Sequence, residues 1–175
     1  MRIYDDQGQE RDHAWLAVMF GPQVRVDTTQ ESPAFHVVEL RASTSKTAIV
    51  TVLDEDGNPL PGKTVVYAHT GGDPRVRKTT DQRGQIQVPM IEVFRYGVPF
   101  NEGPCHAGIP GEHTDVIYGL GDVIIPHGDN RHLDITFQQQ SQIPGSGPSP
   151  TANEPWQRLF EKLDMIIDLL ENDRA

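Results

Sequence analysis

The stretch that decides the fold runs from Ile49 to Met90 and reads IVTVLDEDGNPLPGKTVVYAHTGGDPRVRKTTDQRGQIQVPM. β-branched and aromatic residues dominate positions 47 to 53 and again 63 to 69, and both runs have the length and composition of strands. Residues 85 to 88 alternate glutamine with isoleucine and valine, which predicts a further strand with one buried face. The stretch therefore predicts strands joined by tight turns.

Turn-forming residues separate these runs. Asp54 to Pro59 (DEDGNP) combine carboxylates that can hydrogen-bond their own backbone, a glycine that tolerates positive φ and a proline that interrupts a strand ladder. Thr70 to Pro74 (TGGDP) make another break, and Asp81 to Gly84 (DQRG) precede the last strand of the stretch. We therefore expect the chain to reverse direction at these places.

The spacing V-x-D-x-x-G-x-P-x-x-G-x-x-V, followed by T-D-x-x-G, resembles the immunoglobulin-like and prealbumin-like modules of bacterial surface proteins. The matching residues are Val52, Asp54, Gly57, Pro59, Gly62, Val65, Thr80, Asp81 and Gly84. Such modules include invasin-type and carboxypeptidase-regulatory-like domains, and similar modules accompany secreted bacterial cell-wall hydrolases. The resemblance covers roughly a quarter of the chain. It implies a fold but no ligand, because sandwiches of this kind host many functions.

Further strand candidates lie outside this stretch. They are residues 23 to 27, 35 to 41 and 132 to 137, with two short buried strands expected within 115 to 125. Together with the central stretch they predict a mainly β fold, an immunoglobulin-like antiparallel β-sandwich of about seven strands within residues 1 to 137.

A short N-terminal helix is expected between Asp12 and Pro22. Asp12 precedes an apolar run and Gly21-Pro22 follows it, which is the capping asymmetry of a helix. The apolar stripe of this helix would close one end of the sandwich and consists of Trp15, Leu16, Met19 and Phe20. A buried strand over the same residues is the alternative interpretation.

The composition indicates a loop-rich β protein. Only 36% of the 175 residues are hydrophobic, whereas 14 are proline and 16 are glycine. The formal net charge of -10, from 25 acidic and 15 basic residues, argues against a nucleic-acid partner, because phosphate binding needs clustered Lys and Arg. Cys105 is the single cysteine, so an internal disulfide framework is excluded.

No segment is typical of membrane insertion or of secretion. The chain lacks a run of about 18 apolar residues, which predicts no membrane insertion. Its first residues lack the apolar region of a secretory signal. An extracellular, cell-surface or particle-associated location is expected if the chain is exported or assembled, and a cytoplasmic location stays open.

The irregular region after residue 91 is where a binding site is expected, because functional groups tend to lie on loops held by a rigid scaffold. Aromatic faces beside an arginine suit stacking on a sugar ring or gripping a peptide. The candidate ligand-binding residues are Phe94, Arg95, Tyr96, Phe100 and Tyr118. The alternative is that most of these aromatic side chains fill the core.

The same region is rich in histidine, which raises the hypothesis of a metal site. Imidazole, thiolate and carboxylate groups are all zinc ligands. The candidate metal ligands are His106, His113, His127 and His132. The spacing shows neither a C-x-x-C pair nor a His-x-x-x-His pair on a helix, so polar contacts at loop ends are the favoured alternative, and no cofactor is predicted.

The sequence predicts a protein without enzymatic activity. Cys105 and His106 are neighbours, and adjacent side chains point to opposite faces of an extended segment, so these two do not form a dyad. Another histidine could reach Cys105 through the fold. The carboxylates of Asp54, Glu55 and Asp56 lie on a turn and do not match an EF-hand loop.

Two segments follow the sandwich. Residues 138 to 154 are rich in Gln, Ser, Gly and Pro and predict a flexible linker, because they bury too little apolar surface to offset the entropy cost of ordering. Residues 155 to 171 begin with proline and carry apolar residues at spacings of three and four, which predicts an amphipathic helix. Its apolar residues are Trp156, Leu159, Phe160, Leu163, Ile166, Ile167 and Leu170.

The apolar stripe of this helix needs a partner. Leu159, Leu163, Ile166 and Leu170 are spaced as in a coiled-coil seam, which favours self-association. Docking on the chain's own sandwich and docking in a groove of another protein are the alternatives. A membrane surface is disfavoured, because the polar face of the helix is more acidic than basic.

These observations favour a non-catalytic surface or structural binding module that assembles through its C-terminal helix. The alternative is a carbohydrate-binding accessory domain of a secreted cell-wall hydrolase, which would bind polysaccharide through the aromatic residues between 94 and 118.

Overall fold

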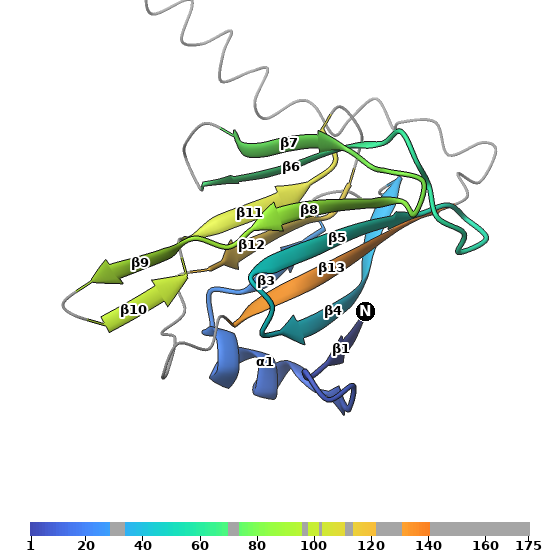
Figure 1. Cartoon of the computed structure of the whole chain (residues 1–175). Coiled ribbons are helices and arrows are strands. Elements are labelled where there is room, and N and C mark those ends of the chain that lie inside the picture. Colours follow the sequence, from blue (N-terminus) through green and yellow to red (C-terminus); the bar gives the residue numbers. More distant parts are fainter. Residues whose placement is uncertain are drawn as a thin grey trace, which may run out of the picture. The chain divides into compact units, whose positions relative to one another are not determined.

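The computed structural model describes residues 1–28, 34–69, 74–95, 98–101, 103–110, 114–121 and 131–140, with side chains described for all of these except 74, 75, 92–95 and 98–101. All of them belong to one compact unit, Met1–Ser141. The helix expected at 155–171, and the linker from residue 141 on, lie outside the described residues. The described part is mainly β and forms two sheets and a separate hairpin (Figure 1).

The first sheet has six strands and the second has five. In spatial order the first sheet contains β2 (Glu10–Arg11), β1 (Arg2–Tyr4), β4 (Phe35–Ser43), β13 (His132–Gln139), β5 (Thr47–Leu53) and β8 (Gln85–Pro89). The second contains β3 (Arg25–Asp27), β12 (Val116–Leu120), β11 (Cys105–Gly108), β6 (Thr64–His69) and β7 (Pro74–Thr79). The hairpin of β9 (Glu92–Arg95) and β10 (Val98–Asn101) projects beyond both sheets in Figure 1.

Most of the strands predicted from the sequence are confirmed. β5 has the predicted bounds, and β3, β4, β6, β8 and β13 end within one or two residues of theirs. The described residues hold 13 strands, more than the seven or so that were expected. The additional ones, such as β1 and β2, are too short to show a recognisable alternation of apolar and polar side chains.

The first sheet is mixed, so the expectation of a purely antiparallel arrangement is wrong in this respect. β1 pairs with β4 in parallel, and β13 pairs with β5 in parallel. The turn after β5 carries the chain from one sheet to the other, because β5 belongs to the first sheet and β6 to the second. Side-chain alternation predicts which face of a strand is buried, but it carries no information on the strand's neighbour or direction.

Both sheets contribute to one hydrophobic core. Phe35 and Phe137 from the first sheet and Val65 and Ile117 from the second have no exposed surface and belong to the same cluster. Because each sheet buries one face against the other, the apolar residues along each strand recur at every second position. The two sheets therefore form two layers around a single core.

The predicted N-terminal helix is confirmed as α1 (His13–Phe20), which Figure 1 shows beside β1. The Asp12 carboxylate caps it by accepting a hydrogen bond from the Trp15 N–H at 2.8 Å. Leu16 and Phe20 are buried in the core, and Met19 packs against it together with Trp15. Because this side of α1 is the predicted apolar stripe, the helix covers part of the core as expected.

Three loops of sequence D-x-x-G-x, at residues 5–9, 54–58 and 81–85, share one hydrogen-bond pattern; we call them the D-x-x-G loops. In each, the aspartate Oδ1 accepts the N–H groups two and four residues further on, at 2.8 to 3.0 Å. The aspartate N–H donates to the carbonyl four residues on, which closes the loop. Each glycine takes a positive φ, of +80°, +85° and +67° in turn.

A backbone hydrogen bond at Gly84 connects the third D-x-x-G loop to the residues that flank the second loop. The Val52 N–H donates to the Gly84 carbonyl at 2.8 Å, and the Leu60 N–H donates to the Val52 carbonyl at 2.9 Å. Thr80 adds side-chain bonds, since its Oγ1 accepts the Lys63 N–H at 2.9 Å and donates to the Leu60 carbonyl at 2.7 Å. A Cβ on Gly84 would lie 2.5 Å from the Val52 oxygen and 2.8 Å from the Leu60 nitrogen, so only glycine fits there.

Replacing Gly84 by alanine should destabilise the protein more than the same change at Gly62. Gly62 also has a positive φ, +80°, but nothing lies within 4 Å of the position its Cβ would take. Gly62→Ala should therefore lower the free energy of unfolding by about 1–2 kcal/mol, the cost of a left-handed backbone. Gly84→Ala adds a backbone clash and should lower it by about 3 kcal/mol or more. Urea denaturation measures both, and equal losses would contradict the close approach at Gly84.

Candidate functional site

The residues predicted to bind a ligand are divided between the hairpin and the second sheet. Phe94 and Arg95 belong to β9, Phe100 to β10 and Tyr118 to β12, whereas Tyr96 lies outside the described residues. The backbone register pairs Phe94 with Pro99 and Phe100 with Val93, so these two phenylalanines are not direct cross-strand neighbours. That they bind a ligand stays a prediction.

Tyr118 is half-buried within the second sheet and is part of a row of stacked side chains. The Arg25 guanidinium carbon lies 5.4 Å from the centre of its ring, and the centre of the His106 ring lies 5.7 Å from it. Arg25 comes from β3 and His106 from β11, the strands on either side of β12. The tyrosine ring therefore has protein neighbours already and is not an isolated platform for a sugar.

The histidines predicted as metal ligands are not gathered in the part of the chain that the structure describes. His106 lies in β11 of the second sheet and His132 in β13 of the first, and His113 and His127 lie outside the described residues. Within the described ranges, no three His, Cys, Asp or Glu side chains are placed to share a metal ion. The metal site stays a prediction.

A serine, a histidine and an aspartate meet where β13 begins. His132 Nε2 lies 3.5 Å from Ser45 Oγ and 3.5 Å from Asp134 Oδ1. In a catalytic triad the serine and the carboxylate contact different ring nitrogens, whereas here both approach Nε2. Ser45 Oγ also donates to the Thr47 carbonyl, and Asp134 Oδ1 accepts the Ile49 N–H at 2.7 Å. The group holds strand ends together and lacks the geometry of a proton relay.

Cys105 has a histidine neighbour that the sequence did not identify. Cys105 and His69 are paired across β11 and β6, and the sulfur lies 3.6 Å from His69 Nδ1. A nucleophilic thiolate must be reachable by its substrate, but Cys105 has no exposed surface. The pair is therefore part of the packing between two strands.

A buried carboxylate joins the two sheets, and sequence reasoning missed it. Asp115, directly before β12, is 3% exposed, and its Oδ2 accepts the Val37 N–H at 2.9 Å and contacts His36 Nδ1 at 3.2 Å. The Asp115 N–H in turn donates to the Phe35 carbonyl at 2.9 Å. At the start of β4, Asp115 thus makes the backbone hydrogen bonds that a neighbouring strand would otherwise make. No local spacing marks it, because Asp115 and Val37 are 78 positions apart.

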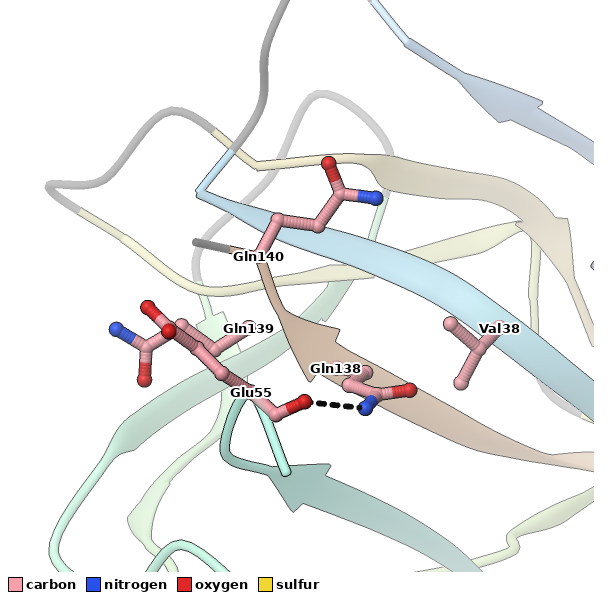
Figure 2. Close-up of a pocket in the computed structure, with 5 residues that line it drawn as sticks. All are labelled: Val38, Glu55, Gln138, Gln139 and Gln140. Carbon is pink, nitrogen blue, oxygen red and sulfur yellow. Dashed lines mark hydrogen bonds between the residues drawn. The ribbon is translucent and has the colours of Figure 1, made fainter. Parts of the chain in front are cut away.

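A shallow groove of about 380 Å³ lies at the end of β13 and is lined by Val38, Glu55, Gln138, Gln139 and Gln140. Figure 2 shows the Gln138 amide reaching to the backbone of Glu55, to whose carbonyl its Nε2 donates at 3.2 Å, with Val38 on the adjacent β4. The Gln140 N–H donates to the Ala34 carbonyl at 2.9 Å, which orders the backbone beyond β13. Amide side chains both donate and accept hydrogen bonds, so the groove suits an uncharged polar ligand.

Sequence reasoning missed this groove because its residues were assigned to other structures. Gln138 and Gln139 were expected to begin the flexible linker, whereas β13 continues through Gln139. Glu55 was expected on a turn, and in the structure that turn contacts the end of β13 through the hydrogen bond from Gln138. The run of three glutamines was the one available signal, and its composition is equally typical of a linker.

A second shallow depression, of about 400 Å³, lies beside α1 and is lined by Glu10, Arg11, Asp12 and Trp15. The Arg11 guanidinium lies over the Trp15 ring at 5.9 Å and also bonds the Asp5 carboxylate at 2.6 Å. Asp12 caps the helix. Because Arg11, Asp12 and Trp15 are already bonded or stacked within the fold, the groove at the end of β13 is the better candidate.

The carboxylates of the first two D-x-x-G loops have lowered pKa values. The hydrogen bond from the Asn58 N–H lowers the pKa of Asp54 most, burial opposes it, and the Asn58 side chain lowers it further. Burial alone would raise the pKa of Asp5, but hydrogen bonds from the Gln9 N–H and from Arg11 outweigh it. A carboxylate with a lowered pKa is a poor proton donor near neutral pH, so neither group suits general acid catalysis.

The chain was compared with known proteins. No family model, curated protein or solved structure matches it. Within the residues that the structure describes, no helix is long and apolar enough to cross a membrane. The function must therefore be argued from the geometry of the chain itself.

Asp54→Asn should make the free energy of unfolding depend less on pH in acid. Because the folded-state pKa of Asp54 lies below the unbonded value of 3.8, its carboxylate stabilises the fold above that pH, and this contribution is lost as the pH falls through the folded value. Asparagine keeps an acceptor oxygen but does not titrate. Urea unfolding between about pH 2 and pH 6 should show a shallower decline for the variant. Asp56→Asn, on the same loop, is the control; a decline as steep as wild type in Asp54→Asn would refute the assignment.

Proposed function

We propose that this protein is a non-catalytic surface or structural binding module that assembles through its C-terminal helix. Its folded part would be an immunoglobulin-like β-sandwich, and the helix at 155–171 the assembling element at the end of a linker. One observation carries the proposal: the apolar residues within 155–171 recur at spacings of three and four, as in a coiled-coil seam, and such a stripe needs a partner.

The described part of the chain has a hydrophobic core of its own. Phe35, Leu40 and Phe137 are fully buried in the first sheet, and α1 adds Leu16 and Phe20 at the edge. These side chains supply the close packing that a stable domain requires. An amphipathic helix of about 17 residues is marginal alone in water, so its stripe gains most from pairing with a second copy.

The bonding of the polar residues supports a role without catalysis. Asp54, Asp81, Asp115 and Asp134 each accept at least one backbone N–H. A carboxylate used in this way stabilises a loop or a strand end, and protonating or displacing it would weaken the fold. Four acidic side chains that could have served acid–base chemistry are thus bound to the backbone.

Aspartate in the helical stripe should abolish assembly. Leu163→Asp or Ile166→Asp places a charge in the coiled-coil seam, where its desolvation opposes pairing. Light scattering should give an oligomer for the wild-type chain and a monomer for either variant. Gln157→Asp adds the same charge outside the stripe and should leave the oligomer intact. A monomeric wild-type chain would end the assembly proposal.

The groove at the end of β13 favours carbohydrate binding as a second candidate function. Its glutamine amides and the Glu55 carboxylate can bond sugar hydroxyls, and Val38 offers a small apolar surface. Among the side chains that the structure describes, no aromatic one lines the groove. The groove would therefore hold a sugar chiefly through hydrogen bonds.

A glycan array followed by calorimetry tests this second candidate. If a saccharide binds in the groove, Gln138→Leu or Gln140→Leu should weaken it about tenfold, the worth of one good hydrogen bond. Gln87→Leu makes the same change on the exposed face of β8 and should have no effect. If the wild-type chain binds no saccharide on the array, carbohydrate binding is refuted as a function.

A further inference from the structure

The outer edges of the two sheets are formed by β2, β8, β3 and β7. β2 and β3 have only two and three residues, and such short edge strands offer little to a further strand. In β8, the Gln85 carbonyl accepts the Asp81 N–H and the Gln87 carbonyl accepts Lys78 Nζ, both at 3.0 Å. β7 differs from these three, because it has six residues and lies outermost in the second sheet, beside β6 (Figure 1).

The direction of the backbone groups in β7 follows from its pairing with β6. The Thr80 N–H donates to the Lys63 carbonyl at 2.9 Å, so these two residues are a hydrogen-bonded pair. Along an antiparallel ladder, such pairs alternate with pairs whose backbone groups point away from each other. The next pair contains Thr79 and the third contains Arg77. Both residues therefore direct their N–H and carbonyl groups away from β6, to the edge of the sheet.

These outward groups of β7 are accessible. Arg77 and Thr79 are exposed, and within the part of the chain that the structure describes no hydrogen bond reaches their backbone from outside the sheet. Each residue supplies one N–H donor and one carbonyl acceptor. An extended peptide that adds a strand to a sheet uses a row of groups of this kind.

The charge around β7 selects the kind of strand that fits. Residues 75–83 contain three arginines and one lysine against one aspartate, in a chain whose net charge is -10. Arg77 is paired with Val66, and the flanking Val65 and Tyr67 are buried in the core, so Arg77 lies on the outer face of the sheet. An acidic residue facing Arg77 on an added strand would be a stabilising pair. A second copy of β7 would instead bring like charges together.

We propose that the edge of β7 binds an acidic, extended peptide of a partner protein by strand addition. The backbone groups of Arg77 and Thr79 bond the peptide and set its register, and the Arg77 guanidinium pairs with a carboxylate on it. This binding goes beyond the proposed assembly, because β7 and the segment 155–171 are separate parts of the chain. Light scattering reports on the helix and peptide binding reports on β7, so the failure of either is distinguishable from the failure of the other.

The test titrates the full-length chain with two capped hexapeptides. One alternates glutamate with valine, and the other has lysine in place of glutamate. The acidic peptide should bind in calorimetry, and the basic peptide should bind at least about tenfold more weakly. Hydrogen exchange at the Arg77 and Thr79 amides should become slower when the acidic peptide is bound, because both amides then donate across the new edge.

Two variants separate the backbone from the charge. Thr79→Pro removes an outward donor, leaves the bonds to β6 intact and keeps every charge, so it should weaken the acidic peptide about tenfold or more. Arg77→Glu keeps the backbone and should shift the preference to the basic peptide. Arg25→Glu makes the same charge change on β3, at the opposite edge of the same sheet, and should bind like wild type.

Four results would overturn the proposal. They are a wild-type chain that does not bind the acidic peptide, equal binding of both peptides, an Arg77→Glu variant that keeps the wild-type preference, and a Thr79→Pro variant that is folded by circular dichroism and binds like wild type. If Thr79→Pro does not fold, the result of Arg77→Glu decides. Exchange at Arg77 and Thr79 that slows with protein concentration alone would assign the edge to a second copy and would also overturn the proposal.

Discussion

Backbone N–H groups at strand ends must find acceptors, and in this protein aspartate carboxylates provide many of them. Asp54 and Asp81 close the loops on either side of Gly84, Asp134 accepts the Ile49 N–H beside β13, and Asp115 takes the place of a missing strand at β4. These bonds fix where strands begin and end, so the faces that bury the core stay aligned. Part of the acidic excess of the chain is therefore structural.

The same bonding limits what chemistry the described part can perform. Serine, histidine and aspartate do meet at the start of β13, and a thiol does meet a histidine across β6 and β11, but the first group converges on one ring nitrogen and the second is enclosed by the core. Polar groups that face solvent in a shared hollow are found instead at the end of β13, where three glutamine amides lie beside Glu55. Amides recognise ligands by hydrogen bonding and do not activate them, which agrees with a binding role.

Local sequence by itself determined the turns, the strands that flank them and α1. The aspartate and glycine of each D-x-x-G loop act within five residues, and the cap of α1 acts within one turn, so their chemistry is legible in the spacing alone. Only the tertiary structure decided that β13 lies parallel to β5, that Gly84 must touch Val52, and that Asp115 reaches Val37. The tertiary structure also formed the groove at the end of β13, because Glu55 on a loop and Gln138 on a strand are 83 positions apart. Such contacts join residues distant along the chain, and no local pattern encodes a partner that only folding brings near.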